Sequence, residues 1–312
     1  MTLQSYGVLC YNTKDNAGVM LSASRKVIRG SRKSTVRLCL SFLYHKGEWK
    51  MEKYDIFIQA GQSNAEGTGG GPVTEEYIPD ERICYLEAPK TTTITDSGLD
   101  IQYHDVPFAL TVAAEHGTAD DPVGDFSLTF SKAYVDAGLL APDRKILIIR
   151  AAVGGTGFQK KQWGVGDILY LKMLEMIDYA LSLNPENQIK GILWHQGEHD
   201  AFEGNTGENY HRQLTMLLNS VKARYDLSDL PFISGSFVAD WRKKNEESCK
   251  PILQALQQVA SEMRGEYVEA DDLLSNDEIK GDGDDIHFCR ESLHILGRRY
   301  FQSYLKIINS SL

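Results

Sequence analysis

The stretch YDIFIQAGQSNAEG, residues Tyr54–Gly67, is the one around which the rest of the chain is organised. Its apolar run Ile56–Ile58 is typical of a buried strand. The run stops at Gly61, and Ser63 and Asn64 follow. A serine just past a buried strand lies at the carboxyl edge of a sheet, where open α/β sheets bind ligands. Ser63 is therefore a candidate nucleophile, and a simple helix N-cap at this turn is the alternative.

The composition predicts a folded protein with a large core, because 42% of its 312 residues are hydrophobic and 24% are charged. The net charge of −10 argues against a nucleic-acid partner, which requires a basic face. No apolar run approaches the length of a membrane span, and the N-terminus lacks the pattern of a secretory signal. We therefore expect a soluble, cytoplasmic protein without membrane contact, whose oligomeric state stays open.

The number and spacing of the cysteines indicate a protein from a reducing compartment. There are five, an odd number without the spacing of a metal site. They are expected to be free thiols, not a disulfide framework. Their positions are Cys10, Cys39, Cys84, Cys249 and Cys289.

Residues 1–50 differ from the rest in charge. They carry nine basic and two acidic residues, a net charge of +7, which leaves −17 on residues 51–312. Apart from a possible strand at Val36–Leu43 they show no clear periodicity. We interpret them as a basic extension outside the native protein, with Met51 as the native start and residues 51–312 as one domain. The codons of Lys46–Glu48 can supply a ribosome-binding sequence before Met51, which favours this hypothesis.

From Met51 onward, strand and helix patterns alternate, which predicts βαβ units and a parallel sheet of about five strands with helices on both faces. The expected strands are Asp55–Ala60, Lys145–Val153, Ile189–Trp194, Pro231–Val238 and Tyr267–Ala270. The expected helices are Ser127–Ala137, Leu169–Leu183, Tyr210–Tyr225, Pro251–Arg264 and Glu291–Ile308. The segment Gly67–Asp125 has little periodicity and is expected to form long surface loops with one short strand.

A glycine-rich turn follows the strand at Lys145–Val153 and reads VGGTG. Adjacent glycines, here Gly154 and Gly155, let the backbone approach a ligand and expose its N–H groups. A phosphate-binding P-loop requires Gly-Lys-Ser/Thr at its end, whereas Phe158 follows Gly157 here. A flexible connection without function is the remaining alternative.

The next strand runs into Trp194–Asp200, WHQGEHD. The Gln196 amide is a candidate donor over the sheet edge, and Glu198, His199 and Asp200 are candidate supports or substrate contacts. The spacing of His195, Glu198 and His199 also fits an inverted zincin motif, but that motif needs both histidines on one continuous helix. Gly197 and the preceding strand disfavour such a helix, so no metal is expected. Solvated loop histidines remain an alternative.

The fourth stretch, Gly281–Phe288, reads GDGDDIHF. A calcium loop requires acids at alternate positions, and Ile286 breaks that alternation. The Asp-x-x-His spacing instead favours a turn in which Asp284 accepts from His287 Nδ1 and leaves Nε2 free as a base. An acidic surface loop is the alternative.

Together these stretches contain the groups that acyl transfer requires. Ser63 is a nucleophile that needs a base, His287 is that base, and Asp284 orients it. A developing oxyanion also needs donors. The candidates are the Ser63 N–H, the Gly154 or Gly155 N–H and the Gln196 side chain. Gln62, Asn64 and Glu198 are candidate substrate-binding residues.

The ordered motifs GQSN, GGT, WHQGE and DxxH resemble the SGNH hydrolase superfamily, and within it the carbohydrate-esterase branch of sialate O-acetylesterases and acetylxylan esterases. The resemblance covers nearly all of residues 51–312. It implies a three-layer α/β/α fold with a flavodoxin-like parallel sheet, and removal of acetyl groups from sugars without a cofactor. It also implies the roles given above for Ser63, Asp284 and His287. Gln196 stands where the superfamily has asparagine, and His199 stands where a small residue is expected.

The resulting expectation is a carbohydrate O-acetylesterase that acts on an acetylated mono- or oligosaccharide. The sequence does not choose between xylan fragments, sialic acids and other acetylated glycans. Three alternatives remain: an SGNH esterase for longer acyl chains, a catalytically silent sugar-binding protein on the same fold, and a zinc hydrolase.

Overall fold

The computed structural model describes residues 51–95, 98–118 and 120–310, together with the backbone of strands β1 (Ser5–Cys10) and β2 (Val19–Ser24). The chain divides into two units, Met1–Lys50 and Met51–Leu312. In the first unit, β1 and β2 pair antiparallel. The strand predicted at Val36–Leu43 lies outside the described residues.

The second unit is built on a sheet of seven strands in the order β13-β12-β11-β3-β10-β4-β7. Neighbouring strands are parallel except at β7, which pairs antiparallel with β4. A mainly parallel sheet is therefore confirmed, but the predicted number of five strands is wrong. The strands are β3 (Lys53–Gly61), β4 (Ile83–Glu87), β7 (Ala109–Val112), β10 (Arg144–Arg150), β11 (Gln188–His195), β12 (Phe232–Gly235) and β13 (Glu266–Val268).

The two additional strands come from Gly67–Asp125, where mostly loops were predicted. In β4 the buried run is only four residues long, which is too short for periodicity to separate it from other structure. As an edge strand, β7 leaves Leu110 42% exposed and lacks a continuous apolar pattern. The same segment forms two small antiparallel pairs outside the main sheet. They are β5 (Lys90–Thr95) with β6 (Gly98–Tyr103), and β8 (His116–Gly117) with β9 (Pro122–Val123).

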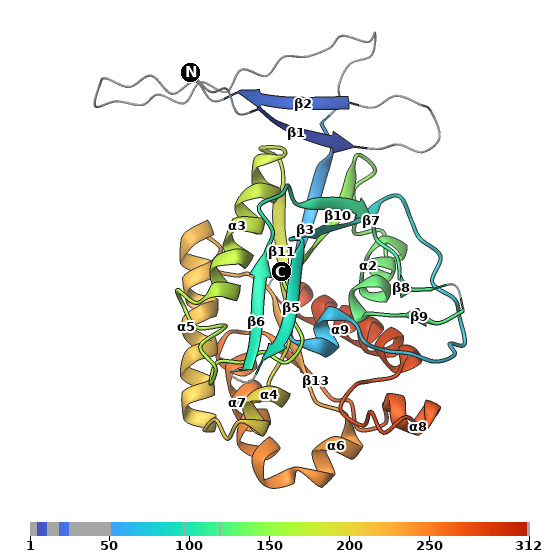
Figure 1. Ribbon diagram of the computed structural model, residues 1–312, viewed down its shortest axis with the longest axis vertical. Helices are drawn as coiled ribbons and strands as arrows, with labels where there is room; N and C mark the ends of the chain where they lie inside the picture. Colours follow the sequence, from blue (N-terminus) through green and yellow to red (C-terminus); the bar gives the residue numbers. More distant parts are fainter. Residues whose placement is uncertain (1–4, 11–18, 25–50, 96–97, 119, 311–312) are drawn as a thin grey trace. The chain divides into compact units, whose positions relative to one another are not determined.

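Helices cover both faces of the sheet, as predicted (Figure 1). One face carries α2 (Phe126–Asp136) and α9 (Arg290–Ser310), and the other carries α3 (Ile168–Ser182), α5 (Gly207–Tyr225) and α7 (Glu246–Glu262). The shorter helices are α1 (Ser63–Glu66), α4 (Glu198–Phe202), α6 (Ala239–Lys244) and α8 (Asn276–Lys280). The predicted start of α7 at Pro251 is wrong, because this proline lies inside the helix and not in the first turn where proline is favoured.

An aromatic cluster joins the central strand β3 to α2 and α9. The Phe57 ring lies 4.9 Å from Phe130, 5.2 Å from Tyr134 and 5.5 Å from Tyr304 between ring centroids, in edge-to-face geometry. The two helices pack closely at Gly297, where a Cβ atom would lie 2.0 Å from the Phe126 carbonyl oxygen. This packing fixes the helix that follows the predicted Asp-x-x-His turn.

The cysteines and the helices that the structure describes bear on two expectations drawn from the sequence. Cys84, Cys249 and Cys289 are free and buried there, which confirms the prediction of free thiols for these three. None of the helices in the described ranges is long and apolar enough to cross a membrane.

Candidate active site

Ser63 lies at the carboxyl end of the central strand β3, as the first residue of α1. The parallel register aligns Gly61 with His195 at the end of β11. Gly61 has φ of +137°, and a Cβ atom there would lie 2.0 Å from the His195 carbonyl oxygen. Glycine is thus required for the close approach of the two strand ends. The turn leaves Ser63 only 7% exposed, at the sheet edge.

The structure brings Ser63, His287 and Asp284 together. His287 Nε2 lies 2.8 Å from Ser63 Oγ, and His287 Nδ1 lies 2.8 and 2.9 Å from the two Asp284 carboxylate oxygens. A carboxylate can only accept, so Nδ1 carries the proton and Nε2 accepts from the Ser63 hydroxyl. This is the geometry of a nucleophile, a base and an orienting acid.

Asn276, which the sequence analysis did not single out, holds Asp284 in this arrangement. Its side-chain N–H groups donate to Asp284 Oδ2 at 2.8 Å and to the Thr68 carbonyl at 3.0 Å, and its Oδ1 accepts from the Gly70 N–H at 2.9 Å. Asn276 is 3% exposed. A capping box at Ser275 marks the start of α8 in the sequence, but nothing there predicts the contact with Asp284.

Asn64 fixes the backbone on both sides of His287. Its Oδ1 accepts from the Phe288 N–H at 3.1 Å, and its Nδ2 donates to the Ile286 carbonyl at 3.1 Å and to Glu198 Oε1 at 2.8 Å. Asn64 and Glu198 are both 0% exposed, so the structure disagrees with the substrate-binding roles predicted for them. Burial raises the pKa of Glu198, and the Asn64 amide partly offsets this shift.

Gln62 also lies inside the protein instead of facing a substrate, with 2% exposure. Its Oε1 accepts from the backbone N–H groups of His199 at 3.1 Å and Gly197 at 3.4 Å. These amides are at the start of α4, where N–H groups have no partner within the helix. Gln62 therefore caps α4 and ties it to the turn that carries Ser63.

The Gln196 amide is occupied by the protein itself. Its Nε2 donates to Asp200 Oδ2 at 2.7 Å and to the Thr156 carbonyl at 3.0 Å, with Gln62 Oε1 at 3.3 Å. An amide nitrogen has two hydrogens, and both are bound to protein acceptors here. The oxyanion role predicted for Gln196 would require one of these hydrogen bonds to be released. Gln196 instead connects α4 to the glycine-rich turn after β10.

Of the two candidate glycines, Gly154 is the one beside Ser63. A Cβ atom at Gly154 would lie 3.4 Å from Ser63 Cβ, whereas a Cβ atom at Gly155 would meet nothing within 4 Å. The Gly154 N–H donates to Glu66 Oε2 at 2.8 Å, and Glu66 Oε1 forms an ion pair with Lys90 Nζ at 2.9 Å. Glu66, which sequence reasoning missed, thus occupies a donor next to Ser63. It lies three residues after Ser63 on α1, a spacing that places two side chains on one helix face.

The two histidines of the zincin-like spacing do not share a helix. His195 ends β11, is 0% exposed, and its Nδ1 lies 3.0 Å from the Tyr300 hydroxyl. Burial lowers the pKa of His195 to about 3, so it is neutral. His199 lies in α4, with its ring stacked on Phe202. Across the residues that the structure describes, no group of three or more His, Cys, Asp or Glu side chains is placed to hold a metal.

The mainly parallel sheet between two helix layers is the fold that the motif resemblance implies, and the solved structures described below share it. Residues 53–306 match the family described as carbohydrate esterase, sialic acid-specific acetylesterase, and the chain belongs to that family.

Several known proteins are similar. A probable carbohydrate esterase of Arabidopsis thaliana is 28% identical over 182 residues, which cover 57% of this chain and 66% of that protein. The crystal structure of NanS superposes with a TM-score of 0.65 at 18% identity, over 83% of this chain and 98% of NanS. A carbohydrate acetylesterase from Xanthomonas citri superposes with a TM-score of 0.55 at 16% identity, over 82% of this chain and 56% of that one. The structural likenesses establish the fold.

Proposed function

We propose that this protein is a serine esterase that removes O-acetyl groups from carbohydrates through an acetyl-enzyme on Ser63. The observation that carries the proposal is the contact of His287 Nε2 with Ser63 Oγ at 2.8 Å, with Asp284 on the opposite ring nitrogen. Membership of a carbohydrate esterase family supports the acetylated sugar as substrate.

In the proposed reaction, Ser63 Oγ attacks the acetyl carbonyl carbon while His287 Nε2 takes the hydroxyl proton. The bond between the carbonyl carbon and the sugar oxygen then breaks, and His287 returns the proton to that oxygen. Water, deprotonated by His287 Nε2, then attacks the acetyl carbonyl carbon. The bond between that carbon and Ser63 Oγ breaks, acetate leaves, and His287 returns the proton to Ser63 Oγ. Asp284 accepts from Nδ1 throughout and stabilises the imidazolium form of His287. The proposed steps use Ser63, His287 and Asp284 together with one water molecule.

The N–H groups of Ser63 and Gly154 are the donors that we propose for the oxyanion. The Ser63 N–H begins α1, where amides have no partner within the helix. Gly154 lies against Ser63, but its N–H is bound to Glu66. The Glu66 carboxylate must therefore leave this N–H before an oxyanion can accept from it.

The substrate class is an acetylated mono- or oligosaccharide, with sialic acid and xylan fragments as the first sugars to compare. The matched family is described as sialic acid-specific, which supports acetylated sialic acids as the first sugars to test. Acetylated xylan fragments follow from the resemblance to acetylxylan esterases.

The test is acetate release from 4-nitrophenyl acetate and from a panel of acetylated sugars, with wild type, Ser63→Ala and the control Ser228→Ala. Ser228 lies exposed in a loop. We expect release by wild type and the control, and none by Ser63→Ala. Equal release by all three would exclude Ser63 as the nucleophile. Binding of acetylated sugars by wild type without acetate release would favour a silent sugar-binding protein.

A comparison of acetyl with octanoyl nitrophenyl esters separates the proposed activity from an esterase for long acyl chains. We expect the acetyl ester to be preferred. A preference for the octanoyl ester would contradict the acetylesterase proposal while keeping Ser63 as the nucleophile.

A further inference from the structure

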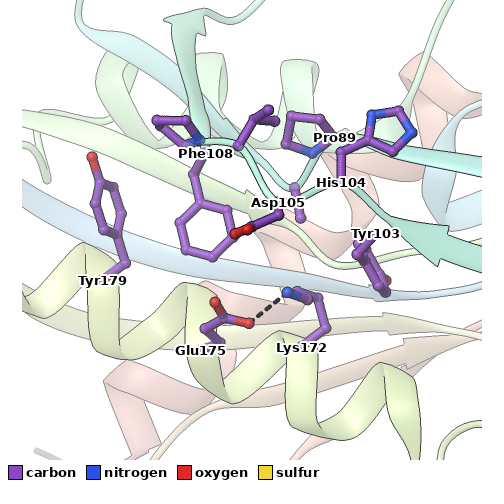
Figure 2. A pocket seen from close by; sticks show the side chains of 11 residues that line it. Pro89, Tyr103, His104, Asp105, Phe108, Lys172, Glu175 and Tyr179 are labelled. Carbon is purple, nitrogen blue, oxygen red and sulfur yellow. Dashed lines mark hydrogen bonds and ion pairs between the residues drawn. The ribbon is translucent and has the colours of Figure 1, made fainter. Parts of the chain in front are cut away.

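A cavity of about 370 Å³ lies between helix α3 and the segment that follows strand β6. We call it the α3 cavity. Its aromatic lining is Tyr103, Phe108 and Tyr179, and its charged lining includes Lys172 and Glu175 (Figure 2). Its volume is within the range of about 300–1,000 Å³ that small-molecule sites occupy.

The side chains of the α3 cavity hold one another in place. The rings of Phe108 and Tyr179 meet edge to face, with centroids 5.1 Å apart. Lys172 Nζ lies 4.8 Å from the Tyr103 ring centroid and 5.8 Å from that of Phe108, and it forms an ion pair with Glu175 Oε2 at 2.5 Å. In Figure 2, Lys172 and Glu175 rise from α3 toward the opposite wall. Such an arrangement is formed before a ligand arrives, which lowers the cost of binding.

A continuous series of contacts links the α3 cavity to Ser63. Tyr103 lies directly opposite Lys90 in the antiparallel β5–β6 pair, so the two side chains are neighbours on one face. Lys90 Nζ binds Glu66 Oε1 at 2.9 Å, and Glu66 Oε2 accepts from the Gly154 N–H beside Ser63. Burial raises the pKa of Tyr103, and the Glu66 carboxylate adds to the shift. Tyr103 of the cavity is therefore connected to the surroundings of Ser63 through Lys90 and Glu66.

The lining combines the two kinds of group that bind sugars. A pyranose ring has apolar C–H faces that pack on aromatic rings, and its hydroxyls donate to carboxylates and accept from ammonium groups. Tyr103 and Phe108 offer the rings, and Glu175 and Lys172 offer the charges. An aliphatic acyl chain would match the rings but would strip water from the ion pair without replacing its hydrogen bonds.

We propose that the α3 cavity is a second sugar subsite, which holds a neighbouring unit of an oligosaccharide whose acetyl group lies at Ser63. This inference rests on the proposed esterase function and narrows its substrate class to acetylated oligosaccharides. It predicts a higher kcat/KM for an acetylated oligosaccharide than for the matching acetylated monosaccharide. The ratio of these two kcat/KM values depends on the cavity residues, whereas Ser63, His287 and Asp284 are needed for both substrates alike.

The experiment measures acetate release from acetylated xylose against acetylated xylotriose, and from acetylated sialic acid against the same sugar joined to lactose. The variants are Lys172→Met, which keeps the length of the side chain, and Glu175→Gln, at a side chain that is 58% exposed. The matched control is Lys132→Met, which removes a lysine that pairs with Asp136 on α2. 4-Nitrophenyl acetate, which has no second sugar unit, reports on the nucleophile alone.

We expect wild type and Lys132→Met to prefer the oligosaccharide of at least one pair. Lys172→Met is expected to reduce kcat/KM for that oligosaccharide by about ten-fold, since it removes a charged hydrogen-bond donor. The rates with the monosaccharide and with 4-nitrophenyl acetate should stay unchanged in both cavity variants. Equal kcat/KM for both members of each pair in wild type, or an unchanged preference in the variants, would overturn the subsite. Absence of acetate release from every substrate would instead overturn the esterase function itself.

Discussion

Replacement of Glu66 by glutamine tests whether this carboxylate restrains the proposed oxyanion site. Glu66 Oε2 accepts from the Gly154 N–H at 2.8 Å, and Lys90 holds the other oxygen at 2.9 Å. An oxyanion formed at Ser63 needs the same N–H. Glutamine keeps the shape and one acceptor oxygen but removes the charge, so it weakens the competing hydrogen bond without opening a cavity.

The expected gain follows from the strength of that hydrogen bond. A hydrogen bond to a charged group contributes roughly 1.5–3 kcal/mol and a neutral one roughly 0.5–1.5 kcal/mol. The Glu66 side chain is 33% exposed, and solvent screening places the difference at the lower end, about 1 kcal/mol. That amount corresponds to about a five-fold higher rate. Lys90 also loses its anionic partner, which favours negative charge near Ser63 and acts in the same direction.

The assay is kcat/KM for 4-nitrophenyl acetate, with Glu75→Gln as a control that makes the same change of charge at an exposed loop position. We expect a rise of about five-fold in Glu66→Gln and no change in the control. A fall in kcat/KM with an unchanged melting temperature would refute the reasoning, because Glu66 would then assist the reaction instead of competing with it.

Three further outcomes are expected. Asn64→Ala leaves the Phe288 N–H and Glu198 Oε1 without their partner, so the free energy of unfolding measured in urea should fall by about 2–4 kcal/mol. In this variant kcat should fall more than KM rises, whereas a change in KM alone would favour a substrate contact. Gly61→Ala would place a methyl group 2.0 Å from the His195 carbonyl oxygen and should lower Tm by about 10 °C or prevent folding. The control is Gly138→Ala, because Gly138 also has positive φ but has open space around it, and its Tm should fall far less. Equal losses of Tm would show that backbone strain alone matters. Burial lowers the pKa of His195 to about 3 from 6.5, so its contribution to stability is present above pH 6.5 and is lost as pH falls toward 3, by about 2 kcal/mol at pH 5. His195→Gln removes the titrating imidazole and should therefore lose less stability than wild type between pH 7 and pH 5, and parallel pH curves would contradict this assignment. The raised pKa of Glu198 acts in the opposite direction, but equally in both proteins.

The strands and helices that could be predicted from the sequence are those with a strong local pattern. Ile56–Ile58 lies in the central strand because a buried parallel strand needs a continuous apolar run. The Asp-x-x-His spacing led to the contact between Asp284 and His287 because three residues of a tight turn suffice to bring the two side chains together. The edge strand β7, which is half exposed and pairs antiparallel, carries no comparable pattern.

The surroundings of Ser63 could not be predicted because they depend on contacts between distant residues. Gln62, Asn64 and Glu198 are polar and close in sequence to candidate site residues, which suggested contact with substrate. Asn64 and Glu198 are 134 residues apart and bury each other's polar atoms, which no local pattern reveals. The Gln196 amide is likewise satisfied by the Thr156 carbonyl, 40 residues away. Polar side chains near a candidate nucleophile can thus stabilise the fold instead of contacting the substrate, and only their hydrogen-bond partners distinguish these two roles.

The contact between Ser63 and His287 joins residues 224 positions apart in the chain. Asn64 makes the same long connection to Phe288, so two hydrogen bonds close nearly the whole domain into one ring. Closing so long a loop is slow in folding, because its entropy must be lost before the contact forms. The proposed chemistry requires both ends of this loop, so it begins only after the His287 turn has packed against Ser63. During refolding, the return of acetate release should therefore lag behind the recovery of helix content.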